Sequence, residues 1–138
     1  DVFTDRAAKR LGQIGPDDLA QRLQSRTTTT NHPPAPVMAM LGEIIVHGED
    51  IRRPLGLRHR APEAALVAVA DNYSRSNLLT GAKRRIAGLR LRASDGDWVH
   101  GEGPEVSGPM ISLILAMTGR SGVDDLTGEG LPLLVGRS

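Results

Sequence analysis

Apolar residues recur at helical spacing through the first half of the chain and then alternate with charged residues. Residues 16–26 begin with Pro-Asp-Asp, which favours the first turn of a helix. The apolar run that starts near residue 35 stops at Pro54 and Gly56, two residues that end helices. The pattern predicts helical structure at residues 5–14, 16–26, 35–53 and 62–79, with a loop at 27–36.

The period changes from helix to strand after residue 88. Residues 89–93 (LRLRA) alternate apolar and charged side chains, which is typical of a strand with one buried face. Short strands are also expected at 98–100 and 106–107, and residues 110–117 form an almost wholly apolar helix that must cover the sheet. We therefore predict an α+β fold in which the 88–107 sheet is antiparallel. A helical region at 1–80 and a small C-terminal α/β domain at 86–138 meet near residues 81–85.

Composition excludes several function classes. The 138 residues are 39% hydrophobic and 24% charged, which suits one ordinary globular domain or two small ones. The net charge of +1 and three aromatic residues give no reason to expect a nucleic acid or an anionic membrane as partner. Cysteine is absent, and no apolar run reaches the length of a membrane span, so a cytoplasmic location is expected. The chain begins at Asp1, which suggests a start that is processed or cut from something longer.

Glu43 and His47 are the first candidates for chemistry. Four residues apart on a helix, a carboxylate and an imidazole share one face and can offer two ligands to a divalent metal. The same spacing is also common for a plain ion pair on a solvated helix. Asp50 lies about 10.5 Å along the helix from Glu43, too far to share one ion with it. Asp50 is therefore expected to be a second-shell group or an ion-pair partner of Arg52 or Arg53.

The remaining histidines provide no further ligand. His32, His59 and His100 lie in stretches rich in Pro, Gly or Arg, and surface positions are expected for all three. A catalytic zinc site usually has three protein ligands, and the sequence identifies only two.

Three long motifs resemble the actinobacterial, mycothiol-dependent maleylpyruvate isomerase family, whose members are DinB-like. These motifs are residues 46–56 (VHGEDIRRPLG), 88–98 (GLRLRASDGDW) and 101–109 (GEGPEVSGP). The similarity extends to residues 4–11 (TDRAAKRL) and 119–128 (GRSGVDDLTG), so it covers the whole chain.

The resemblance implies a metal-binding helical bundle followed by a small α/β region like that of sterol carriers. Glu43 and His47 match two metal ligands of the family, and the metal is usually taken as zinc. Mycothiol would be the thiol cosubstrate, activated by the metal for isomerisation or S-transfer on an electrophilic small molecule. Arg6 matches an arginine that holds polar groups of the ligand.

The resemblance also implies that about sixty N-terminal residues are missing, with two helices of a four-helix bundle and the first histidine ligand. A non-catalytic binding or scaffold protein of the same fold, with an incomplete metal site, is therefore the alternative. Without those helices, an apolar stripe would stay uncovered, and we expect a homo-oligomer that covers it. The members of this stripe are Val37, Met40, Leu41, Ile44 and Ile51.

Overall fold

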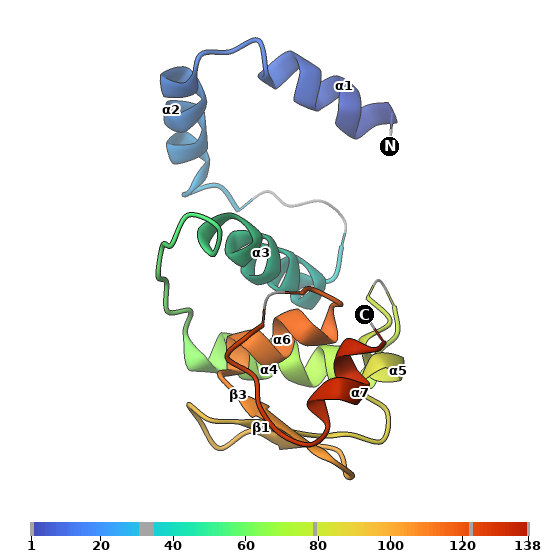
Figure 1. The fold of residues 1–138 in the computed structure, drawn as a ribbon. Helices are drawn as coiled ribbons and strands as arrows, with labels where there is room; N and C mark the ends of the chain where they lie inside the picture. The colour runs from blue at the N-terminus through green and yellow to red at the C-terminus, as the bar shows by residue number, and fades with distance from the viewer. Residues whose placement is uncertain (1, 31–34, 79, 122, 138) are drawn as a thin grey trace. The chain divides into compact units, whose positions relative to one another are not determined.

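The computed structural model describes residues 2–30, 35–78, 80–121 and 123–137, and it has an α+β fold (Figure 1). The chain divides into two compact units, Asp1–Pro34 and Ala35–Ser138. This division lies well before the predicted boundary near residues 81–85. The reason is that helices on both sides of that boundary pack together and share one core, as described below.

The first unit contains two helices, α1 (Val2–Leu11) and α2 (Pro16–Arg26). Helix α2 begins with Pro16 and two acidic residues, as its sequence predicts. No residue of α2 is buried, and Leu23 is 72% exposed. The first unit therefore lacks a hydrophobic core at α2.

Two longer helices open the second unit. Helix α3 (Val37–Arg52) follows Pro36, and α4 (Glu63–Arg75) follows Pro62; both prolines have the extended backbone that precedes a helix. Helix α4 ends before the predicted residue 79, because Ser76 is extended. A short helix, α5 (Ala82–Arg85), was not predicted. Gly81, which precedes it, has the left-handed φ of 65° that glycine tolerates best.

The sheet is mixed, so the prediction of an antiparallel sheet is wrong for one pair of strands. Its order is β2-β1-β3, with β1 at Arg90–Ala93, β2 at Val99–His100 and β3 at Glu105–Gly108. Strand β2 pairs antiparallel with β1, whereas β3 pairs parallel with β1. After β2 the chain reverses and crosses to the other edge of β1, so that β3 runs in the direction of β1.

Glycines make this reversal possible. Gly101 and Gly103 have φ angles of 79° and 123°. A Cβ atom on either residue would collide with the carbonyl oxygen of Leu89 or Gly88, respectively. The turn can therefore pass against the start of β1 only without side chains at these two positions.

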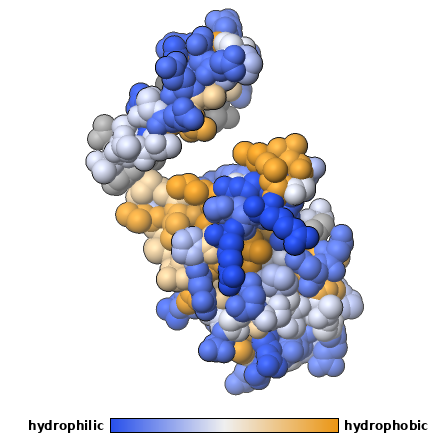
Figure 2. Space-filling view, turned by 90° about the vertical axis from the view of Figure 1, so that its left-hand side faces the viewer, coloured by the Kyte–Doolittle hydropathy of each residue, from blue (hydrophilic) through white to orange (hydrophobic). Residues whose placement is uncertain are grey.

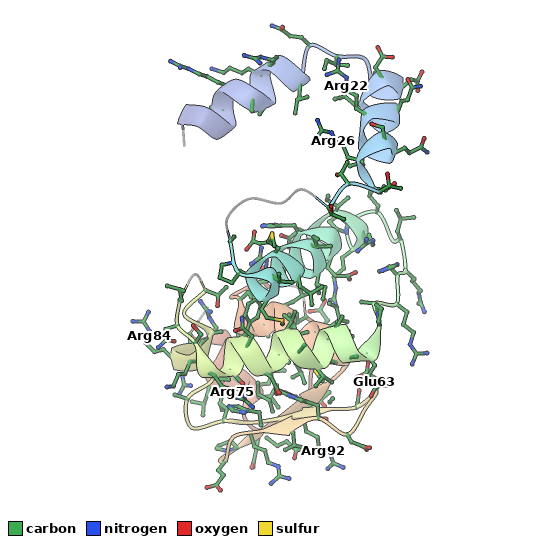
Figure 3. The ribbon with its side chains drawn as sticks, turned by 180° about the vertical axis from the view of Figure 1, so that it is seen from behind. Arg22, Arg26, Glu63, Arg75, Arg84 and Arg92 are labelled. Carbon is green, nitrogen blue, oxygen red and sulfur yellow. The ribbon has the colours of Figure 1, made fainter. Side chains whose placement is uncertain are left out.

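The core of the second unit lies between the sheet and helix α6 (Met110–Met117). The apolar side chains of β1 and β3, Leu91 and Val106, are almost completely buried, as are Leu113 and Ile114 of α6. Helix α4 packs beside α6 over the sheet, and α3 packs against α4 on the side away from the sheet (Figure 1). Arg92 projects from the opposite, exposed face of the sheet (Figure 3). The predicted helix at 110–117 is confirmed.

The last helix, α7 (Leu131–Val135), is held by two arginines that bind carbonyl groups. The Arg137 guanidinium donates to the carbonyls of Arg85 and Ala87 at 2.9 and 2.7 Å. In return, Arg85 donates to the carbonyl of Arg137 at 3.3 Å and to that of Met117 at 2.6 Å. This reciprocal pair joins the ends of α5, α6 and α7.

One side of α3 exposes apolar residues. Val37, Ile44 and Ile51, which we call the outer stripe, are 66%, 69% and 64% exposed, and they recur every seven residues. Leu41, from the same predicted stripe, is instead partly buried against the core. Among the described residues, no helix has both the length and the apolar character needed to cross a membrane.

Candidate functional site

His47 lies between two carboxylates on the exposed side of α3. Its Nε2 atom is 2.9 Å from Oε2 of Glu43, and its Nδ1 atom is 2.9 Å from Oδ2 of Asp50. Helical spacing explains the arrangement, because residues three and four apart lie on one face. The prediction that Glu43 and His47 project to the same side is confirmed. The prediction that they face a bundle interior is wrong in this structure, because their side chains are 56% and 58% exposed.

Arg120 completes this group, which we call the polar cluster: Glu43, His47, Asp50 and Arg120. Its Nε and Nη2 atoms donate to the two carboxylate oxygens of Asp50 at 3.1 and 2.9 Å. This bidentate contact is the strongest common geometry of an arginine–carboxylate pair. Arg120 follows α6, so the contact ties α3 to a segment seventy residues further along the chain.

The expected partners of Asp50 were wrong. Arg52 and Arg53 instead lie near Glu49, with nitrogen–oxygen distances of 3.6 and 3.4 Å. At 100° per residue, Arg53 lies about 60° from Asp50, toward the buried side of the helix. Spacing within one helix could not reveal Arg120, because its distance from Asp50 depends on how α6 packs.

Electrostatics within the polar cluster follow from this geometry. The hydrogen bonds from Arg120 hold the pKa of Asp50 below its ordinary value, although partial burial opposes the shift. The same contact raises the pKa of Arg120. Asp50 is thus ionised and can accept a hydrogen bond from Nδ1 of His47, while Nε2 faces Glu43.

Tyr73 lies beside the cluster. Its side chain, on α4, is 5% exposed, and burial followed by the charge of Glu43 raises its pKa. Gly42 makes the approach possible, since a Cβ atom there would collide with the Tyr73 hydroxyl and lie 2.9 Å from its Cζ atom. The phenol therefore stays protonated and can act as a hydrogen-bond donor.

The donor set fits part of a metal site. A histidine that ligates a metal usually donates its second ring N–H to a carboxylate, which is the relation of His47 to Asp50. Glu43 and Nε2 of His47 are close enough for one ion to bind both. Across the described ranges, however, no group of three or more His, Cys, Asp or Glu residues is arranged to hold a metal. The polar cluster thus offers two ligands and one orienting carboxylate.

The other predicted residues lie elsewhere. His100 is half-buried on β2 and stacks on Trp98, with ring centroids 6.0 Å apart. His59 is exposed in the segment between α3 and α4, and His32 lies outside the described residues. Arg6 is exposed on α1, in the first unit. Its role in ligand binding stays a prediction.

A second polar network was not predicted. Ser112, fully buried on α6, accepts a hydrogen bond from Nη2 of Arg53 and donates one to Asp125, each at 2.7 Å. Glu49, 9% exposed, lies 3.4 Å from the other side of Arg53. These contacts fix the end of α3 against α6, which is a structural role. The only sequence signal was a carboxylate on the apolar side of a helical pattern.

Comparison of the chain with protein-family models, with curated proteins and with solved structures found no match. The resemblance to the isomerase family therefore stays a prediction.

Proposed function

We propose that this chain is a divalent-metal-binding protein of the mycothiol-dependent maleylpyruvate isomerase type. Glu43 and His47 are two of its metal ligands, with zinc the expected ion. The observation that carries the proposal is the position of the His47 ring, held by Asp50 through Nδ1 while Nε2 faces Glu43. The DinB-like bundle portion and the sterol-carrier-like region belong to the same proposal.

Each residue of the polar cluster has a separate task in this proposal. Asp50 fixes the tautomer and direction of His47, and Arg120 holds Asp50 in place. Tyr73 supplies a protonated hydroxyl near Glu43. A bound divalent ion would lower the pKa of a small thiol such as mycothiol and favour its thiolate. Arg6 is the proposed contact for a carboxylate of the substrate.

Zinc binding to the metal-stripped protein, measured by isothermal titration calorimetry, tests this proposal. We expect His47→Ala to abolish binding and Asp50→Asn to weaken it by about tenfold, the usual effect of losing an orienting carboxylate. His100→Gln, which removes a histidine outside the cluster, should leave the affinity unchanged. Equal zinc binding by the wild type and His47→Ala would contradict the proposed ligand.

A non-catalytic binding or scaffold protein of the same fold is the second candidate. Two observations favour it: the polar cluster has only two ligands among the described residues, and the outer stripe is exposed. In this alternative, Glu43 and His47 form a plain ion pair. Absence of zinc binding by the wild type, together with stable self-association, would favour this candidate over the metal-dependent one.

A further inference from the structure

A cavity of about 380 Å³ lies beside α3 and extends from Ile44 of the outer stripe to the buried side of the helix. Its wall comes from α3, from the segment between α3 and α4, and from the start of α6. At 100° per residue, Ile45 and Arg52, which line it, lie about 160° and 140° from His47 around α3. Every lining residue belongs to the second unit. We call this space the side cavity.

The inner wall of the side cavity is apolar. Ile45 and Leu66 are buried, and Ile111 and Ala61 are partly buried against the same core. Figure 2 looks onto this side of the molecule and shows apolar surface set back between strongly hydrophilic segments. A volume of this size is at the small end of the range for sites that bind small molecules.

The side cavity is lined by two acids and two arginines, Glu49, Asp95, Arg52 and Arg60. Its two acids are already engaged: Glu49 lies between Arg52 and Arg53, and Asp95 accepts the backbone N–H of Met110 at 2.8 Å. In contrast, the exposed Arg60 guanidinium has neither an ion pair nor a hydrogen bond within the described part of the chain. An apolar wall next to an unengaged guanidinium fits a molecule with an apolar body and one carboxylate.

We propose that the side cavity binds a small monocarboxylic acid with a compact apolar body. The carboxylate pairs with Arg60, and the body packs on Ile45, Leu66 and Ile111. This site is separate from the polar cluster and does not depend on a bound metal. It gives the chain a ligand-binding function that holds whether or not Glu43 and His47 bind zinc.

Cyclohexanecarboxylate is a suitable probe, with cyclohexanemethanol and cyclohexylmethylamine as analogues that replace the carboxylate by a neutral or a positive group. Binding to the full chain is followed by NMR chemical-shift changes of backbone amides. We expect the acid to bind at least about tenfold more tightly than either analogue, because a charge-assisted pair is lost with both. The shifts should centre on residues 44–66 and 111.

Arg60→Gln and Arg58→Gln form a matched pair of variants. Both remove an exposed arginine from the same segment, but only Arg60 lines the side cavity. We expect Arg60→Gln to weaken binding of the acid by about tenfold and Arg58→Gln to have little effect. Equal losses in the two variants, tighter binding of the amine, or no binding of the acid would overturn the proposal. His47→Ala should bind the acid as tightly as the wild type does. That result would show that acid binding does not depend on the proposed metal site.

Discussion

The two sides of α3 carry similar apolar residues but have opposite surroundings. One side packs on the core through Ile45 and Val46, whereas the outer stripe of Val37, Ile44 and Ile51 is exposed. Composition does not distinguish the sides, since isoleucine and valine occur on both. On the buried side, Gly42 lets Tyr73 of α4 approach the helix closely. Close packing therefore follows the fit of shapes as well as the number of apolar residues.

The largest expected difference between the two sides is in how much stability the protein loses when an isoleucine is replaced by alanine. Ile45→Ala should lower the free energy of unfolding by about 2–4 kcal/mol, because it leaves a cavity in the core. Ile44→Ala, its neighbour on the outer stripe, should change it by no more than about 0.5 kcal/mol. Urea denaturation at low protein concentration measures both. Equal effects would show that Ile44 is also packed within one chain.

Self-association through the outer stripe is the next expected effect. We predict a dimer in which two copies cover their stripes, because burying an isoleucine contributes about 1.5–3 kcal/mol. Ile44→Arg should therefore weaken the dimer by about tenfold or more. Sedimentation velocity over a concentration series measures the change, and Arg92→Gln on the exposed face of the sheet is the control. A wild type that stays monomeric throughout the series would contradict the prediction.

Two glycines of α3 sharpen the comparison further. Gly42→Ala should destabilise the protein by about 1–2 kcal/mol, since the added methyl group collides with Tyr73. Gly48→Ala meets only the movable end of Arg52, and alanine favours a helix by about 1 kcal/mol. This second variant should therefore be neutral or more stable. Thermal denaturation of the two variants shows whether each substitution stabilises or destabilises the protein. If both substitutions destabilise it, the geometry of the helix rather than the contact with Tyr73 is the cause.

The smallest effect concerns the ion pair of Asp50 with Arg120. The pKa of Asp50 is lowered in the folded protein, so the pair stabilises the fold above the unfolded pKa of about 3.9. This stabilisation is lost as the pH falls through the lower, folded pKa. Asp50→Asn should cost at most about 1 kcal/mol at neutral pH, because the pair is partly exposed.

Once the pH falls below the lowered, folded pKa of Asp50, the wild type and Asp50→Asn should converge in stability, since both side chains are then uncharged. Asp124→Asn, a change at an exposed acid in the same unit, is the control and should show no such convergence. Denaturation curves from neutral to acid pH test this. A constant difference between the wild type and Asp50→Asn across that range would exclude a charged contact as its cause.

Sequence patterns predicted the elements better than their contacts. The helix at 110–117 and the strand within 89–93 were predictable because their apolar periods are unambiguous. The parallel β1–β3 pair was not, because it depends on the path of the chain after His100. Glu43, His47 and Asp50 could be grouped by helical spacing alone. Arg120 and Tyr73 join them only through tertiary packing, for which the sequence carries no local signal.

The reciprocal contact of Arg85 and Arg137 has a consequence for how the protein opens in acid. Its acceptors are backbone carbonyls, which do not become protonated in the range where carboxylates do. The contact that ties α3 to Arg120, in contrast, needs an ionised Asp50. Acidification should therefore weaken the contact between α3 and Arg120 while the contact between α7 and α5 persists. The attachment of α3 to Arg120 thus depends on a carboxylate, whereas the attachment of α7 to α5 through Arg85 and Arg137 does not.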